Sequence, residues 1–186
     1  MKVTTTRPAL PMTYDEYALL PQDRNRYEIL DGELYMTPSP DYLHQLVLYR
    51  LVAILSAYVE PRELGQLLFA PMDVLLDEIN IVQPDLLFLS RLKIPSRGAK
   101  NIRVAPDLVV EILSPSSAEQ DRVNKKRIYA RHGVPHYWIV DPNDRIFEVY
   151  ELAGAEYRLA GSSSGDGSAT SSLFPGLTIP LVRLWS

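Results

Sequence analysis

The stretch Leu-Val-Val-Glu-Ile-Leu at residues 108–113 decides the fold that the sequence predicts. Five of its six residues are apolar, which is typical of a short strand buried on both faces of a sheet. Ser-Pro-Ser-Ser at residues 114–117 ends this strand, and Ser117 is suited to cap a helix over residues 118–132. A second strand is predicted over residues 136–140. The order strand, helix, strand favours a mixed α/β sheet with flanking helices.

Further elements are predicted on both sides of this unit. Asp31-Gly32 is a strong turn signal between two strand-like segments, and it predicts a β-hairpin over residues 26–36. Apolar residues at helical spacing predict a helix over residues 41–59, and a shorter one capped by Thr13 is predicted over residues 12–20. Additional strands are predicted over residues 66–76, 81–89, 146–152 and 157–159.

Length and composition limit the class of protein. The 186 residues suit one domain, 1–186, with residues 1–11 as a flexible N-terminus and the Gly/Ser-rich residues 161–172 as a mobile loop. The absence of cysteine excludes disulfides, zinc sites built on cysteine and thiol nucleophiles, and it fits the cytoplasm. No stretch approaches the ~20 apolar residues of a membrane span, so no membrane is expected as a partner.

Two carboxylates fall inside apolar predicted strands. Asp85 lies in the strand over residues 81–89, and Glu111 lies in the strand over residues 108–113. A carboxylate is costly to bury without a partner, so two in successive strands indicate a shared site. Paired carboxylates are hard oxygen ligands suited to Mg²⁺. Asp107 shares the strand face of Glu111 by alternation, but it is better interpreted as a turn residue at the strand entry.

A lysine near these acids is suggested by the following helix. Asp121, Lys125 and Tyr129 are spaced i, i+4 and i+8, so they line roughly one helix face. Spacing alone favours a solvent-facing ion pair of small energetic value between Asp121 and Lys125. Lys126 lies about 100° further around the helix and competes with Lys125 as the functional lysine.

The residues resemble a known family. Pro84-Asp85, then Glu111 and then a lysine resemble the signature of the PD-(D/E)xK nucleases. The segments Tyr-Glu-Ile-Leu-Asp-Gly-Glu-Leu at 27–34, Val-Glu-Ile-Leu-Ser-Pro-Ser at 110–116 and Tyr-Trp-Ile-Val-Asp-Pro at 137–142 resemble the Uma family of restriction-endonuclease-like proteins. The resemblance runs from about residue 12 to residue 185.

The resemblance implies both a fold and a site. The implied fold is α/β (α+β): a restriction-endonuclease-like core whose mixed central sheet is flanked by helices, with an N-terminal β-hairpin and extra C-terminal strands. Asp85 and Glu111 would bind Mg²⁺ or Mn²⁺, and Lys125 would orient a water or stabilise developing negative charge. The usual signature places its lysine two residues after the acid, where this chain has Leu113, so Lys125 would act from the following helix.

Three other positions are weaker candidates. Glu28 matches the first acidic position of the family, as a metal ligand or a water-orienting group; the alternative is an exposed strand acid. His44 would touch a phosphate or substrate, with helix capping or packing as the alternative. Lys126 and Tyr129 complete the candidate substrate contacts.

The positive charge is concentrated in one segment. Residues 91–131 hold ten Lys/Arg and four Asp/Glu, a net of +6, so the rest of the chain must carry −10 to reach the total of −4. A basic segment of this kind can contact a nucleic-acid backbone without reading its sequence, although a solvated loop and helix face is the commoner outcome. Five of the cations precede the Glu111 strand: Arg91, Lys93, Arg97, Lys100 and Arg103.

Together these features predict a metal-dependent endonuclease that hydrolyses nucleic-acid phosphodiester bonds, with DNA as the expected substrate. The alternative is a nuclease-like fold that serves as a catalytically silent binding or assembly module. Analogy with related folds, which pair two sites on two strands, leads us to expect a homodimer.

Overall fold

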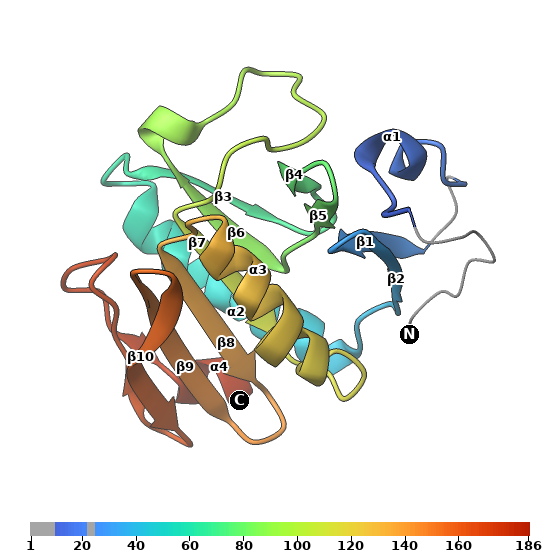
Figure 1. Ribbon diagram of the computed structural model, residues 1–186. Coiled ribbons are helices and arrows are strands. Elements are labelled where there is room, and N and C mark those ends of the chain that lie inside the picture. Colours follow the sequence, from blue (N-terminus) through green and yellow to red (C-terminus); the bar gives the residue numbers. More distant parts are fainter. Residues whose placement is uncertain (1–9, 22–24) are drawn as a thin grey trace.

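The computed structural model describes residues 10–21 and 25–186, so most of the predicted flexible N-terminus lies outside the described residues. A six-stranded sheet forms the centre, with one long helix behind it and a second helical segment in front of it (Figure 1). A four-stranded sheet lies beside this layered body and carries the N-terminal hairpin (Figure 1). The predicted mixed α/β (α+β) architecture is confirmed.

The six-stranded sheet contains the strand–helix–strand unit. Only β7 and β8 run parallel; all the other neighbours in this sheet are antiparallel. Parallel strands need a long crossover, and here the crossover is the π-helical turn η2 (Gln120–Lys125) continued by α3 (Lys126–Arg131). The strand order is β10 (Glu156–Ser164), β9 (Ile146–Ala153), β8 (His136–Asp141), β7 (Leu108–Ile112), β6 (Leu86–Ser90) and β3 (Gly65–Phe69).

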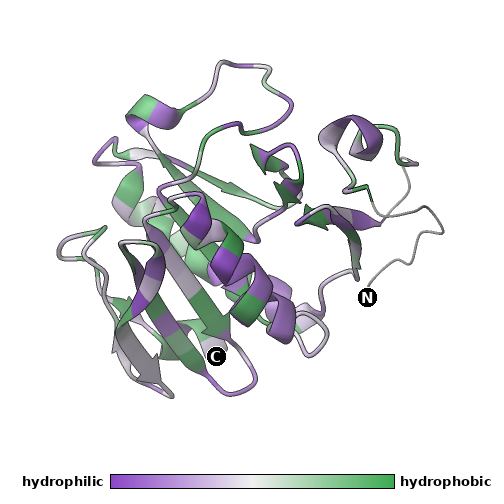
Figure 2. Cartoon of the chain, viewed as in Figure 1, coloured by the Kyte–Doolittle hydropathy of each residue, from purple (hydrophilic) through white to green (hydrophobic). Residues whose placement is uncertain are grey.

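Alternation along the strands divides the core between two faces. Val110 and Trp138 face α2 (Tyr42–Val59), whose Leu51 packs against them. Val109 faces the opposite way, into a second cluster with Tyr129 of α3. Figure 2 shows the hydrophobic residues concentrated in the central strands, whereas the α3 ribbon in front of them is largely hydrophilic. Glu111 has the parity of Val109 and therefore points toward the α3 side.

The four-stranded sheet confirms the predicted hairpin. Its order is β2 (Glu33–Thr37), β1 (Arg26–Leu30), β5 (Asn80–Val82) and β4 (Val74–Asp77). Asp31 and Gly32 form the turn, both at positive φ. The predicted N-terminal helix is present as α1 (Tyr14–Tyr17), capped at Thr13, but it is shorter than residues 12–20.

Two predicted strands are each divided between the two sheets. Residues 66–76 become β3 and β4, and residues 81–89 become β5 and β6. Pro71 and Pro84 lie at the breaks, and proline has no N–H to donate to a strand ladder. The prediction that Asp85 lies inside a continuous strand is therefore wrong, because Asp85 lies in the break just before β6.

The helix predicted over residues 118–132 is present over residues 118–131, with the π-helical turn η2 before α3. A further prediction is corrected. Half of the loop predicted over residues 161–172 is strand: β10 continues to Ser164, and β11 (Ser168–Ala169) pairs with β12 (Ile179–Pro180). Serine is tolerated there because β10 is an exposed edge strand whose backbone, more than its side chains, makes the pairing. The short helix α4 (Val182–Trp185) ends the chain beside α2.

Candidate active site

A polar cleft of about 270 Å³ opens where the two sheets approach each other. One wall comes from the hairpin β1–β2 and the loop that leads into α2, and the other from the end of β7, the loop over residues 114–117 and η2. Apart from Tyr35 and Asp41, seven charged or titratable side chains share this cleft: Arg26, Glu28, His44, Asp85, Glu111, Asp121 and Lys125. Four of the seven are carboxylates. All seven except Arg26 are buried.

Asp85 is held by groups from three elements. Its Oδ2 accepts a hydrogen bond from the backbone N–H of Ile112 in β7 at 2.9 Å and lies 3.0 Å from Nε2 of His44 in α2. Nη1 of Arg26 lies 3.6 Å from Oδ1. Burial alone would raise the pKa of Asp85, but His44, Lys125 and Arg26 together lower it below its ordinary value. Asp85 is therefore ionised at neutral pH.

Glu111 lines the same cleft, and its side chain is contacted from the helix side. Its Oε1 accepts a hydrogen bond from the Tyr129 hydroxyl at 2.8 Å and lies 3.3 Å from Nζ of Lys125. Burial raises the pKa of Glu111 well above its ordinary value, and the neighbouring carboxylates add to this effect while Lys125 opposes it. The carboxyls of the cleft thus outnumber the positive charges that could neutralise them.

Lys125 stands at the centre of three carboxylates. Its Nζ lies 3.0 Å from Oε1 of Glu28, 3.3 Å from Oε1 of Glu111 and 3.3 Å from Oδ1 of Asp121. Burial would lower the pKa of Lys125, but these carboxylates raise it well above its ordinary value. They are expected to keep Lys125 charged. The solvent-facing Asp121–Lys125 pair favoured by spacing is wrong, since the helix face packs onto the sheet and leaves the Lys125 side chain only 5% exposed.

Lys126 lies outside this cluster. Its Nζ sits 3.5 Å from the centre of the Tyr150 ring, and its side chain lines a separate groove of about 830 Å³ between α3 and the β9–β10 turn. Of the two candidate lysines, only Lys125 reaches the carboxylates. Tyr129 does reach Glu111, but it does not line the cleft, so the geometry makes it a support of Glu111 instead of a substrate contact.

Glu28 is buried, so the alternative of an exposed strand acid is wrong. Its Oε1 accepts a hydrogen bond from the backbone N–H of Gln83 at 2.8 Å in addition to the contact with Lys125. Its Oε2 accepts one from the Thr37 hydroxyl at 3.2 Å. Both oxygens are already engaged, which makes Glu28 a less suitable metal ligand than Asp85 or Glu111.

His44 belongs to the site and does not cap the helix. Asp41 is the N-cap of α2 and accepts a hydrogen bond from the backbone N–H of His44 at 2.8 Å. The His44 ring reaches Asp85, while its Nδ1 is buried and has no hydrogen-bond partner among the described residues. This geometry fits a residue that orients Asp85 at the edge of the cleft.

Arg26 and Asp121 complete the cluster. Arg26 was missed, although strand alternation places it two residues before Glu28 on the same face of β1. It also donates to the Gln83 carbonyl at 2.8 Å, which fixes the guanidinium near Asp85. Burial is the main reason that the pKa of Asp121 is raised to about 6.

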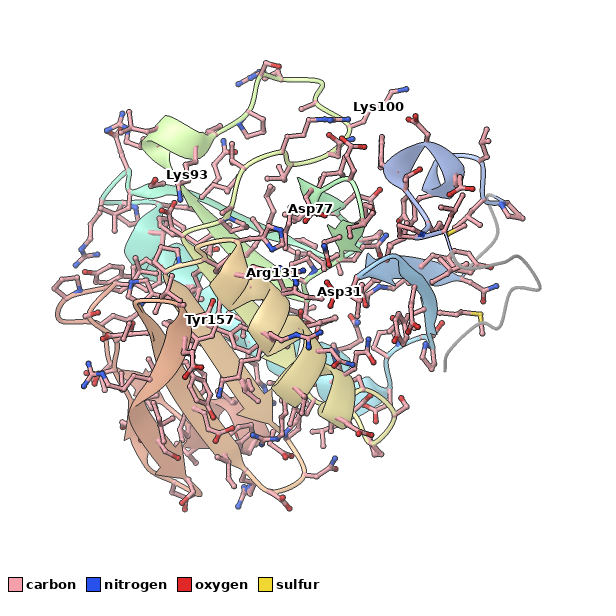
Figure 3. All side chains as sticks on the ribbon, viewed as in Figure 1. Asp31, Asp77, Lys93, Lys100, Arg131 and Tyr157 are labelled. Atoms are coloured by element: carbon pink, nitrogen blue, oxygen red, sulfur yellow. The ribbon has the colours of Figure 1, made fainter. Side chains whose placement is uncertain are left out.

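The basic loop before β7 does not reach the cleft. None of its five cations lines it, and three have structural contacts: Lys93 with Asp107, Arg91 with Glu63, and Arg103 over the Tyr14 ring. Figure 3 shows Lys93 and Lys100 on this loop, on the side of the molecule away from the start of α3. Asp107 accepts a hydrogen bond from the backbone N–H of Ser90 at 2.7 Å, as expected for a strand-entry residue.

The donor set fits a divalent cation that keeps part of its water shell. In residues 10–21 and 25–186, no three carboxylate or imidazole side chains are already grouped as metal ligands, because Lys125 stands between Glu28, Glu111 and Asp121. Mg²⁺ commonly uses only one or two carboxylates plus water and phosphate oxygens. Asp85 and Glu111 are the carboxylates of the cleft that could supply two oxygen ligands to such an ion.

Comparison with known proteins now identifies the family. Residues 14–182 match the family Uma2, whose description is "Putative restriction endonuclease". The chain belongs to the Uma2 family. Among solved structures, one described as "a putative nuclease belonging to DUF820" from Anabaena variabilis is similar, with a TM-score of 0.80 and 22% identity over 94% of this chain and 98% of that chain. No curated protein matches the chain.

These findings confirm the resemblance and the fold. At 22% identity the solved structure shows the fold alone. The Uma2 match supports a nuclease-like function and a nucleic acid as the partner. Within the Uma2 fold of this chain, Asp85, Glu111 and Lys125 come together from the start of β6, from β7 and from η2.

Proposed function

We propose that this Uma2 protein is a metal-dependent endonuclease that hydrolyses phosphodiester bonds of nucleic acid. One observation carries the proposal: Asp85, Glu111 and Lys125 line one cleft, within a family described as "Putative restriction endonuclease". Buried groups whose pKa values are strongly shifted and which face a cleft are typical of catalytic sites. Buried charged groups that served only the stability of the fold would not have to face a cleft.

Asp85 and Glu111 would hold Mg²⁺ or Mn²⁺ in this cleft. The ion would polarise the phosphodiester and lower the pKa of the attacking water. Asp85 is suited to the role because it is ionised and, among the residues that the structure describes, its Oδ1 faces only Arg26, at 3.6 Å.

The remaining residues position groups and stabilise charge. Lys125 fixes the Glu111 carboxylate and places a permanent positive charge beside the reacting phosphate. Arg26 is the other cation of the cleft, and its partly exposed guanidinium is suited to bind a phosphate oxygen. His44 orients Asp85 through Nε2.

We further propose that DNA is the substrate and that the protein acts as a homodimer. Cleavage of both strands of a duplex needs two sites, and a symmetric dimer supplies them. The alternative, a catalytically silent module, is favoured by one observation: Lys125 already neutralises carboxylates that a metal would otherwise use. Cleavage of DNA by the wild type would distinguish the endonuclease from the silent module.

The test is a cleavage assay on plasmid and linear DNA with Mg²⁺ or Mn²⁺. Asp85→Asn should abolish cleavage, whereas Asp107→Asn should retain it. The two are matched, because both aspartates follow a proline and directly precede a strand, yet only Asp85 lines the cleft. Lys125→Met and Lys126→Met form a second matched pair, of which only Lys125→Met should lose cleavage.

Metal binding has a separate readout. Titration calorimetry with Mn²⁺ should give heat with the wild type and none with Glu111→Gln. Binding of DNA without cleavage by the wild type would favour the silent module. Equal cleavage by wild type and Asp85→Asn would overturn the site.

A further inference from the structure

The outer face of α2 carries a stripe that no described part of the chain covers. Tyr42 and Tyr49 are 81% and 71% exposed. The other members are exposed or, for Leu46, half-buried. They recur every three or four residues and so lie on one side of the helix. We call this set the α2 stripe; it comprises Tyr42, Gln45, Leu46, Tyr49, Ala53 and Ala57.

The stripe is unusual because it has no charge. Only one of the 18 residues of α2, Arg50, is charged, and its guanidinium donates to the Leu184 carbonyl on the flank of the helix. By length and composition α2 is apolar enough to cross a membrane, although its opposite face packs on the six-stranded sheet. A helix face that meets water is normally polar and charged. The α2 stripe therefore has the character of a covered surface.

We infer that the α2 stripe is a homodimer interface in which two α2 helices pack antiparallel across a twofold axis near Tyr49. The order of side-chain sizes supports this arrangement. Large residues occupy the first half of the stripe, and the alanines Ala53 and Ala57 occupy the second half. Antiparallel pairing sets Tyr42 against Ala57 and Leu46 against Ala53 of the second copy. Large then meets small along the helix, as close packing requires.

The chemistry of the stripe disfavours other occupants. Nucleic acid is unsuitable because no member is cationic. Tyrosine combines a large apolar area with a hydroxyl and is enriched at protein interfaces. Gln45 can likewise form hydrogen bonds across a protein interface, which a lipid interior could not provide. A second copy presents the same uncharged surface.

The proposed dimer also has a geometric consequence for the cleft. Pro40, Asp41 and His44, at the start of α2, line the cleft. A helix of 18 residues is about 27 Å long, so antiparallel pairing would put the two clefts toward opposite ends of the pair. The use of these clefts for two strands rests on the proposed nuclease function; the dimer itself does not.

Sedimentation equilibrium tests the interface. The wild type should have twice the chain mass of 21.1 kDa, and Tyr49→Arg should have the mass of one chain, because two like charges would meet at the twofold axis. Leu92→Arg is the control, since Leu92 is 99% exposed on η1 (Arg91–Lys93) and should leave the dimer intact. Circular dichroism checks that both variants fold.

A cysteine variant gives a second, independent measurement. The chain has no cysteine, so Tyr49→Cys introduces its sole thiol. Oxidation should link two Tyr49→Cys chains by a disulfide, whereas Leu92→Cys should stay monomeric on a non-reducing gel. A monomeric wild type, a dimeric Tyr49→Arg or a missing cross-link would each overturn the interface. A monomeric wild type that binds phosphatidylcholine vesicles would mean that lipid covers the stripe. None of these results depends on cleavage, so an inactive wild type would contradict only the proposed function.

Discussion

The buried charges of the cleft are costly individually and stable only together. Removing one partner from a buried ion pair commonly costs about 3–5 kcal/mol, because the other charge stays buried without compensation. Lys125 has three carboxylates as partners, so its loss would leave all three without their nearest cation. Well-packed apolar side chains often stabilise such a location as well or better. The cluster is therefore best explained by its chemistry and not by its contribution to stability.

Asp107 provides a contrast at the same scale, because its charge serves stability. Burial alone would raise the pKa of Asp107, but Lys93 and the backbone N–H of Ser90 outweigh this effect and lower it. A lowered pKa means that the charged form stabilises the fold above the unfolded pKa. This contribution is lost as the pH falls through the folded pKa.

We predict that Asp107→Asn lowers the free energy of unfolding by about 1–2 kcal/mol at pH 7, where the ion pair with Lys93 is intact. The difference from the wild type should shrink as the pH falls from the ordinary pKa of an aspartate through the lowered pKa of folded Asp107, where the wild-type carboxylate protonates. Urea unfolding at a series of pH values measures this. A difference that is constant with pH would show that the charge of Asp107 does not contribute.

At the scale of elements, the site depends on two irregular segments. The break between β5 and β6 places Asp85 beside the end of β7, where it accepts the hydrogen bond from Ile112. The π-helical turn η2 carries Asp121 and Lys125, and such turns often occur at functional sites. The β1–β2 hairpin supplies Arg26 and Glu28 and is joined to α3 by Asp31, which pairs with Arg127 and Arg131. Figure 3 shows Asp31 and Arg131 near each other.

The hairpin turn is the most constrained of these connections. Gly32 has φ +78°, and a Cβ there would lie 2.2 Å from Cβ of Pro11. Gly133 has a similar φ of +72°, but no atom lies within 4 Å of its Cβ position. We predict that Gly133→Ala costs about 1 kcal/mol of unfolding free energy from backbone strain alone.

Gly32→Ala should lower the free energy of unfolding by roughly 1–3 kcal/mol more than Gly133→Ala does, because the backbone must also move to relieve the clash between the new Cβ and Pro11. Nucleic-acid cleavage by Gly32→Ala should also fall, because the same hairpin carries Glu28. Denaturant unfolding of the two variants measures the comparison. Equal losses of unfolding free energy in the two variants would mean that Pro11 moves aside at little cost.

At the scale of the molecule, ten of the 19 Lys/Arg of this chain, whose net charge is −4, fall within residues 91–131, in two separate places. The loop over residues 91–103 contributes no lining residue to the cleft. The exposed side of α3 carries Lys126 and Arg127 directly after Lys125, and these two line the neighbouring groove. The α3 cations directly follow η2, which forms part of one wall of the cleft, whereas no residue of the loop lines it.

Salt dependence of DNA binding measures this difference. Removing one cation that binds a phosphate should reduce the slope of log K against log salt by about 0.9. We predict a reduction of roughly 2 for the double variant Lys126→Ala/Arg127→Ala and little change for Arg97→Ala/Lys100→Ala. A larger reduction for Arg97→Ala/Lys100→Ala would show that the loop, and not α3, contacts the nucleic-acid backbone.

The sequence by itself determined the strand–helix–strand unit, the Asp31-Gly32 hairpin and the candidate acids Asp85 and Glu111. These follow from local signals: apolar runs, turn residues and carboxylates in apolar surroundings. Only the tertiary structure decided that Asp85 lies in a break between two sheets, that Lys125 and Glu28 are buried, and that Arg26 faces Asp85. Burial and pairing arise where segments distant in the chain pack together, and no local pattern contains that information.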